Sequence, residues 1–487
     1  MRKTLKNLTI IILVILGISC SDDQLNKTIR MQSPKDGTKS LSLDKAPILK
    51  WESDGENFDI YCDTHNPPIT KLNTEKIQTK EFTLYKLKGN TKYYWKIVAE
   101  NKDIVTENKV WSFTTAKRNN NSWYKRYNVP RYGFRGKSII KTKDGGIIII
   151  EATISGQRYA WKLDINGEEV WKHDLTMIPK NSTALITNND NGGYTILHRY
   201  MKDNSYTFVF FNENCQAQKS VTQILKPRTS ICSAIQTKDG GFILIGQQGC
   251  KNSSNNNIWY AKTDLQGRIV WEETFGDEYS NEVPKAIIET GDNGYAISGS
   301  TTKNIFTSEK NTTREYALFI KTDLDGYVIF NKQGTFGNKY DQIAETLIST
   351  SNSDIIMGCN TNSLGSSYCK LLIQKINKEG KVQRFIFNND NQELIKQIIE
   401  TQDGGFAILA TTSNETKGKT DILLIKTNNK FEKLWSKKYG GSGVEKAISL
   451  IQTFDGGYAI LGSSTEENNK EYGWFIKTDD EGLVDLN

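Results

Sequence analysis

The sequence is poor in histidine and has no long apolar segment after its first twenty residues, and these absences exclude several kinds of protein. Only 3 of its 487 residues are histidine, which disfavours a histidine-based metal site and a Ser-His-Asp triad, since both need histidine at defined places. No later segment has about 18 consecutive apolar residues, so no membrane-spanning helix is expected. The formal charge is only +7, and no basic run is interleaved with aromatic residues, so nucleic acid is not an expected partner.

What is present favours many thin β-layers. The hydrophobic fraction is 37%, but aromatic residues reach 10% and the chain has 38 glycines. The aromatic content argues against disorder. A chain of 487 residues is also too long for one ordinary core, so several domains or a repeat architecture is expected.

The amino terminus resembles a bacterial lipoprotein signal. A basic start is followed by an apolar run over residues 8–18, whose helix would span roughly 16 Å, half a bilayer core. The run ends in Gly17, Ile18, Ser19 and Cys20. The resemblance implies that residues 1–19 are a signal peptide and that Cys20 becomes the acylated first residue. Gly17 departs from the family pattern, in which leucine is usual, and a plain secretory signal with an incidental cysteine is the alternative.

Two aspartates follow the lipidation cysteine. Ser21, Asp22 and Asp23 are similar to the acidic export signal of Bacteroidota-type surface lipoproteins. This resemblance implies an outer-membrane protein, anchored only by lipid and exposed at the cell surface, with residues 20–28 as a tether. A simple polar tether is the alternative. Without residues 1–19, which hold three positive and no negative charges, the formal charge would be +4.

Residues 29–116 are expected to form a small β-sandwich. Strand patterns alternate with turn signals such as residues 34–37 and 66–68. A tryptophan on an early strand, a Leu-x-x-x-Thr-x-Tyr corner and a final Trp-Ser-Phe-Thr-Thr strand resemble a fibronectin type III module. The resemblance implies structural roles for Trp51, Tyr93, Trp95 and Trp111, and a spacer function for the domain.

The remainder, residues 120–487, repeats one unit. Asp-Gly or Asn-Gly turns recur between apolar strands, and a degenerate copy at residues 351–354 brings the number of copies to seven. Asp or Asn followed by Gly favours the positive φ angles of a two-residue hairpin. The second half of most units carries Lys-x-Asp-x-x-Gly or a relic of it, followed by an aromatic residue on the outgoing strand. Four short strands per unit of ~50 residues predict a β-propeller.

The last unit lacks most of its outgoing strand, which predicts how the ring closes. Asn487 stands only eight residues after Asp479 of the last motif. Trp123 has the spacing of an outgoing-strand aromatic before the first turn, although no complete unit precedes it. The sequence therefore predicts an all-β protein: a fibronectin type III-like sandwich followed by a seven-bladed propeller closed by an N-terminal strand near Trp123.

No motif gives a catalytic, cofactor-binding or metal-binding residue. The tryptophans of the repeat are explained by strand packing. Asp323 and Asp325 resemble the start of a calcium loop, but the distal glutamate is missing, which favours a side-chain-capped turn. His65, His173 and His198 have no metal-ligand spacing and are expected to be ordinary surface or strand residues.

Export would place the remaining cysteines in an oxidising compartment. Cys232 and Cys250 flank one turn, and Cys359 and Cys369 bracket a short loop. We expect both pairs to form cross-strand disulfides. Cys62 and Cys215 are expected to be unpaired.

The repeat resembles the Asp-Gly-Gly propellers of Bacteroidota lipoproteins and, more distantly, quinoprotein-like propellers. Quinone-dependent dehydrogenases also need adjacent cysteines, which this chain lacks. The leading hypothesis is a non-catalytic surface lipoprotein that needs no cofactor and whose propeller binds a glycan or protein partner. Two alternatives remain: a polysaccharide-active hydrolase or lyase with carboxylates facing the axial channel, and a docking subunit of an envelope uptake or assembly complex.

Overall fold

The structure is a computed structural model that describes residues 29–484 except 43–46, 74, 85–86, 88, 102–103, 108, 117–121, 129–137, 153–157, 176–182, 189–192, 201–203, 252–253, 293, 307–310, 334–341, 362–369, 388–391, 415–417 and 467–470. The predicted signal peptide, tether and Cys20 lie outside these residues. Every regular element in the described part is a strand, which agrees with the predicted all-β class. No helix there is long and apolar enough to cross a membrane. Contacts divide the chain into two compact units, one chiefly within residues 29–113 and the other chiefly within 114–484.

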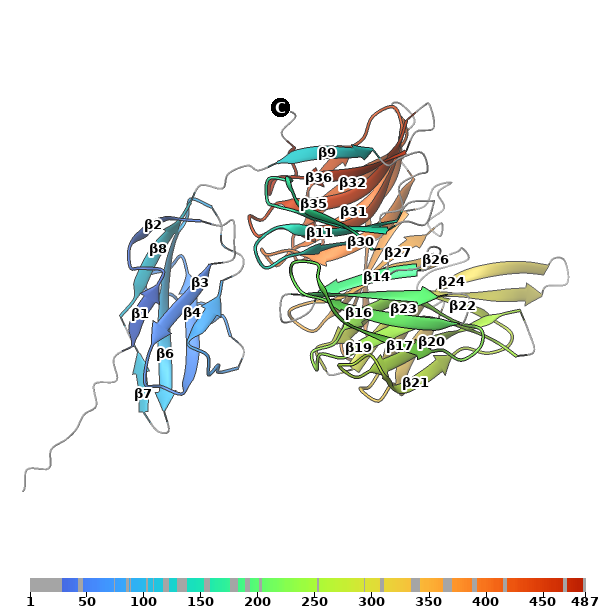
Figure 1. Cartoon of the computed structure of the whole chain (residues 1–487), viewed down its shortest axis with the longest axis horizontal. Coiled ribbons are helices and arrows are strands. Elements are labelled where there is room, and N and C mark those ends of the chain that lie inside the picture. Colours follow the sequence, from blue (N-terminus) through green and yellow to red (C-terminus); the bar gives the residue numbers. More distant parts are fainter. Residues whose placement is uncertain are drawn as a thin grey trace, which may run out of the picture. The chain divides into compact units, whose positions relative to one another are not determined.

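The first unit consists of two antiparallel sheets, coloured blue in Figure 1. One has the order β1-β3-β5 and the other β2-β8-β6-β4, with β7 paired to β6. The strands are β1 (Arg30–Ser33), β2 (Thr38–Leu41), β3 (Ile48–Glu52), β4 (Asn57–Asp63), β5 (Glu81–Thr83), β6 (Lys92–Asn101), β7 (Ile104–Glu107) and β8 (Trp111–Thr115).

The core of the first unit is aromatic. Trp51 and Trp95 have 1% and 0% of their surface exposed, and Tyr93 and Trp111 have 8% each. Trp95 lies 4.7 Å from Trp111 between ring centroids, and Tyr93 stacks on Phe113 at 5.7 Å. The structural roles predicted for these four residues agree with this burial.

The second unit is built from consecutive four-stranded antiparallel meanders, which we label A to G. Meanders A to E are separate sheets, whereas F and G are joined by one parallel bridge between Thr420 and Val444. Meanders A to C contain β10 (Ser138–Lys141), β11 (Ile147–Ala152), β12 (Arg158–Leu163), β13 (Glu169–Asp174); β14 (Thr183–Asn188), β15 (Tyr194–Tyr200), β16 (Ser205–Phe211), β17 (Ala217–Ile224); and β18 (Thr229–Gln236), β19 (Phe242–Gly249), β20 (Asn256–Thr263), β21 (Ile269–Phe275).

The other meanders repeat the same order. Meanders D and E contain β22 (Asn281–Thr290), β23 (Gly294–Phe306), β24 (Asn311–Thr322), β25 (Val328–Gln333); and β26 (Gln342–Ser349), β27 (Ile355–Thr361), β28 (Lys370–Ile376), β29 (Val382–Phe387). Meanders F and G contain β30 (Glu393–Glu400), β31 (Phe406–Asn414), β32 (Gly418–Thr427), β33 (Lys433–Tyr439); and β34 (Val444–Gln452), β35 (Tyr458–Thr465), β36 (Glu471–Lys477), β9 (Trp123–Asn128).

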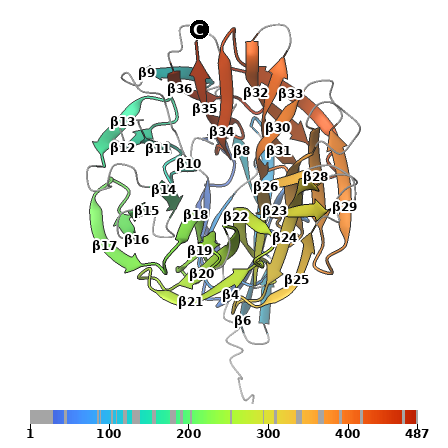
Figure 2. The same ribbon diagram turned by 90° about the vertical axis from the view of Figure 1, so that its right-hand side faces the viewer.

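The meanders are arranged in a ring. The first strand of each contacts the first strand of the next, and β34 of meander G contacts β10 of meander A. Figure 2 shows the first strands nearest the middle of the ring and the fourth strands at its rim. Apolar clusters fill the spaces between neighbouring meanders, as expected when twisted sheets pack face to face around an axis.

An amino-terminal strand completes the last meander. β9 pairs antiparallel with β36, with Trp123 opposite Lys477. Trp123 also packs where a side chain on Gly167 of meander A would stand, just as Trp271 of meander C packs against Gly326 of meander D. Trp123 therefore packs between meanders G and A as Trp271 packs between meanders C and D. The pairing of β9 with β36 is the one that the sequence predicts.

The Asp-Gly turns differ from the predicted two-residue hairpins. In the first, the Gly145 N–H bonds to the carbonyl of Thr142, and only Gly145 has a positive φ, at 91°. Such a turn is a type I turn followed by one left-handed residue. Asp144 is a central residue of the type I turn and needs no positive φ. Its carboxylate caps the turn by accepting bonds from the Thr142 hydroxyl and the Gly146 N–H.

Candidate ligand site at the ring closure

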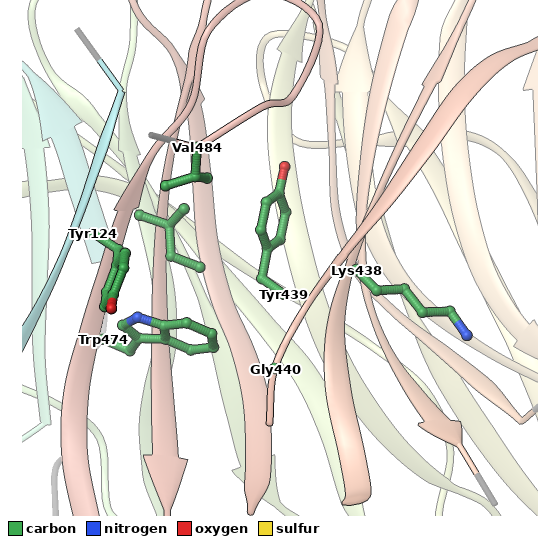
Figure 3. A pocket seen from close by; sticks show the side chains of 7 residues that line it. Tyr124, Lys438, Tyr439, Gly440, Trp474 and Val484 are labelled. Carbon is green, nitrogen blue, oxygen red and sulfur yellow. The ribbon is translucent and has the colours of Figure 1, made fainter. Parts of the chain in front are cut away.

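A cavity of about 300 Å³ lies where meander G meets meander F. It is lined by Tyr124, Lys438, Tyr439, Gly440, Trp474, Ile476 and Val484. Three of these side chains are aromatic, and Figure 3 shows Tyr124 beside Trp474 with Tyr439 across from them. Its volume is at the lower end of the range for small-molecule sites, and its aromatic lining with few polar groups is typical of them.

Strand pairing positions the aromatic lining. Tyr124 of β9 stands opposite Ile476 of β36 and is 45% exposed. Trp474 lies two residues earlier on β36, so its ring is on the same side of the strand, with 6% exposed. The Tyr439 hydroxyl donates to the carbonyl of Gly482 at 2.9 Å. Burial raises the pKa of Tyr439, and Asp479 adds to the effect, so the phenol is a neutral donor at physiological pH.

Meander C shows how the corresponding space is closed elsewhere. Trp259 is the counterpart of Trp474, since each stands three residues before the motif lysine, and it is completely buried. Its indole N–H donates to Glu272 at 2.8 Å, and Glu272 pairs with Lys226 at 2.7 Å. In meander G the position of Glu272 is occupied by Tyr124. The cavity thus lies where a tyrosine stands at the position that a carboxylate occupies in meander C.

The wall of the cavity carries one positive side chain above a buried carboxyl group. Lys438 extends away from the three rings in Figure 3. Asp421 of β32 is only 6% exposed and lies against Gly440. Burial raises the pKa of Asp421, although the charge of Lys438 acts in the opposite direction. The described lining itself holds no carboxylate.

Charged side chains on the inner strands contact each other. Glu345 of β26 accepts Lys285 of β22 at 3.3 Å and Lys396 of β30 at 3.5 Å. Glu289 and Glu400, also on inner strands, accept backbone N–H groups of neighbouring turns at 2.9 Å. Each of these three carboxylates is therefore already engaged by its neighbours.

The motif lysines are structural. In six meanders the lysine of the second motif pairs with the acid of the first turn. The pairs are Lys162 with Asp144, Lys262 with Asp239, Lys321 with Asp292, Lys375 with Asp354, Lys426 with Asp403, and Lys477 with Asp455. Meander B has Phe210 in place of the lysine and Asn191 in place of the acid, so charge is lost from both positions together.

The predicted Cys232–Cys250 disulfide is absent from the structure, where both thiols are free. Cys232 occupies a bulge in β18, and its sulfur lies 3.7 Å from the carbonyl of Pro284 in the next meander. Cys250 lies beyond the last β18–β19 pair, with its sulfur 3.3 Å from Asn257 Oδ1. The two are not opposite each other, and a disulfide needs short, well-aligned Cβ positions. Cys62, Cys215 and Cys359 are also free thiols, while Cys369 lies outside the described residues.

Other residues considered in the sequence have ordinary structural surroundings, with one exception. Asp323 accepts the Tyr327 N–H at 2.8 Å, as in a capped turn. His65 is exposed beside Asp63, and His173 is exposed on β13. His198 differs because it is buried between meanders A and B, with 5% exposed. Within the described residues no three acidic, cysteine or histidine side chains could hold a metal ion together.

Sequence reasoning missed the cavity because it treated the tryptophans as packing residues only. Trp474 does pack in the core between meanders F and G, but it also lines the cavity. A comparison of repeats could have found the site. Only in meander G does a tryptophan three residues before the motif lysine occur together with an aromatic residue at the position that Glu272 occupies in meander C.

No protein-family model matches the sequence, and no curated protein matches it. Among solved structures, the β-propeller domain of the Trilobed protease from Pyrococcus furiosus is similar over 74% of this chain and 100% of its own, with 10% identity and a TM-score of 0.43. A quinoprotein alcohol dehydrogenase-like protein from Bacteroides thetaiotaomicron is similar over 84% and 94%, with 11% identity and a TM-score of 0.37. An α-L-arabinanase from Penicillium chrysogenum complexed with arabinobiose is similar over 63% and 98%, with 10% identity and a TM-score of 0.41. At these values the likenesses assign no activity to the chain.

Proposed function

We propose that the protein is a non-catalytic lipoprotein that binds a glycan at the cell surface through the cavity at its ring closure. Its second unit would be a seven-bladed propeller, with β9 completing the last blade. Its first unit would be a fibronectin type III-like spacer at residues 29–116. The signal-like residues 1–19 and Cys20, followed by two aspartates, support lipid anchoring and display on the outer membrane.

The observation that carries this proposal is the aromatic lining of the cavity. Tyr124, Tyr439 and Trp474 offer apolar ring faces against which the C–H groups of a sugar can pack. The Tyr124 hydroxyl and the Lys438 ammonium are polar groups suited to sugar hydroxyls, and the Tyr439 hydroxyl, which donates to Gly482, can still accept a hydrogen bond. A cavity of about 300 Å³ has room for one or two sugar rings.

Binding is favoured over a polysaccharide-active enzyme by the state of the carboxylates. Three of the inner-strand acids, Glu289, Glu345 and Glu400, are held by neighbouring N–H groups or lysines. Glycoside hydrolysis needs two carboxyl groups facing each other across a sugar. A protein partner, including a docking role in an envelope complex, remains the second form of the binding hypothesis.

A glycan-array screen of the purified full-length chain, followed by titration calorimetry with each hit, tests the proposal. Tyr124→Ala should weaken binding about fivefold or more, because stacking on an aromatic ring contributes about 1 kcal/mol or more. Tyr279→Ala is the matched control, since Tyr279 is 85% exposed and does not line the cavity. Equal affinity in Tyr124→Ala would reject the cavity as the glycan site, and hydrolysis of a bound glycan would reject the non-catalytic role.

A further inference from the structure

Arg158 and His198 are two buried basic side chains at the interface of meanders A and B. Arg158 begins β12 and is 4% exposed, while His198 lies in β15 and is 5% exposed. Arg158 is two residues from Ala160, and His198 is two residues from Ile196. Because alternate strand residues share a face, both side chains extend the apolar interface that contains Ala160 and Ile196.

Each side chain has one buried nitrogen without the partner that burial normally requires. The Nε atom of Arg158 and the Nδ1 atom of His198 are buried and make no hydrogen bond. Among the described residues, no carboxylate forms an ion pair with Arg158. A buried charge without a partner is strongly unfavourable, and buried charges in proteins are almost always paired.

The electrostatic environment places the positive charge on Arg158, beside a neutral His198. Burial lowers the pKa of His198 to about 4, and the charge of Arg158 contributes in the same direction. Burial also lowers the pKa of Arg158. An anion at this position would be attracted by the guanidinium and could accept hydrogen bonds from both side chains.

We propose that Arg158 and His198 form a binding site for a small oxyanion: a carboxylate, sulfate or phosphate group. The guanidinium would donate to two oxygens in the fork geometry that arginine uses for such groups, and His198 would donate to a third position. This site is separate from the cavity at the ring closure and does not depend on a role for that cavity.

Thermal unfolding of the full-length chain tests the proposal. The unfolding midpoint is measured in sodium sulfate and in sodium galacturonate, each against sodium chloride at equal ionic strength. Sulfate stabilises most proteins by exclusion from their surface, so Arg158→Met is measured in the same solutions to give that general contribution. The wild-type midpoint should rise more than the variant's, by an amount that grows with anion concentration.

Arg228→Met is the matched control, because the Arg228 guanidinium already donates to the carbonyl of Cys250. It should lower the midpoint without changing the response to sulfate. Arg158→Met should not lower the midpoint in chloride, because it removes an unpaired buried charge. Equal responses to sulfate in wild type and Arg158→Met would overturn the proposal, as would a large loss of stability in Arg158→Met in chloride.

Titration calorimetry of the wild-type chain with potassium sulfate is a direct second measurement, which does not depend on the variants folding. Saturable binding supports the site. The site is contradicted if no heat of binding is measured at sulfate concentrations up to 50-fold above about 1 mM and sulfate gives no specific thermal shift. A response to sulfate alone identifies a free inorganic ion as the ligand. A response to galacturonate as well identifies an oxyanion carried by a sugar.

Discussion

Two aspartates with the same hydrogen bonds but different burial give a sharp test of the repeat's energetics. Asp455 accepts bonds from the Thr453 hydroxyl at 2.5 Å, the Gly457 N–H at 3.1 Å and Lys477 at 2.7 Å. Its side chain is 9% exposed and that of Lys477 is 3% exposed. Asp455→Ala would leave a buried ammonium without its counter-charge, which typically costs about 3–5 kcal/mol. We expect the free energy of unfolding to fall by about 3 kcal/mol.

Asp239 is the matched control. It accepts the equivalent bonds from Thr237 at 2.6 Å and Gly241 at 3.0 Å, and it pairs with Lys262 at 2.8 Å. Its side chain is 64% exposed although that of Lys262 is only 9% exposed, so water can reach the space that the carboxylate leaves in Asp239→Ala and solvate the ammonium. The expected loss is about 1 kcal/mol, the upper range for a pair that water can reach. Both losses are to be measured by urea unfolding, monitored by tryptophan fluorescence and circular dichroism.

A double variant separates the charge effect from the loss of the turn cap. Asp455→Asn with Lys477→Phe copies the pair that meander B carries and leaves no buried charge, so it should be less destabilising than Asp455→Ala. Equal losses for Asp455→Ala and Asp239→Ala would refute the reasoning, because burial would then not determine the strength of the pair.

Three further predictions concern a turn, the pH response and the closing strand. Gly326→Ala should cost about 2–3 kcal/mol in urea unfolding, because the added carbon would lie 2.7 Å from the Trp271 ring, whereas Gly404→Ala, with a positive φ but open space, should cost about 1 kcal/mol. Burial opposes ionisation of Asp63, but backbone N–H bonds outweigh it and lower its pKa to about 2. The stabilisation that ionised Asp63 gives the folded state is therefore complete above about pH 4 and is lost toward pH 2. Asp63→Asn should flatten this part of the curve of unfolding free energy against pH. Trp123→Ala should lower stability by about 3 kcal/mol and speed amide exchange in β36, and unchanged exchange there would count against β9 as the closing strand.

Much of the ring could be predicted from sequence because each repeat has the same pattern of turns and apolar strands. Asp-Gly turns alternate with apolar strands, so strand order within a meander follows from local chemistry. The pairing of β9 with β36 was predictable for a related reason: the last unit lacks a strand, and Trp123 has the spacing of the missing one. The type of turn was predicted wrongly. The turn is a type I turn capped by the Asp144 carboxylate, and it has a positive φ only at Gly145.

The candidate sites could not be predicted in the same way, because they depend on exceptions to the repeat. The cavity requires a tyrosine from β9 to meet a tryptophan from β36, across more than 300 residues of sequence. The Arg158–His198 site depends on two strands of neighbouring sheets that place an arginine and a histidine at one interface. The wrong Cys232–Cys250 pairing came from counting distance along a hairpin without knowing of the bulge at Cys232.

The most direct test of the proposed function is the affinity of the full-length chain for its best array glycan, measured by titration calorimetry for the wild type, Tyr124→Ala and Tyr279→Ala. Our proposal predicts saturable binding by the wild type and Tyr279→Ala, binding that is weaker by about fivefold or more in Tyr124→Ala, and no cleavage of the glycan during the titration. Binding that is unchanged by Tyr124→Ala, or a glycan that is cleaved, would contradict it.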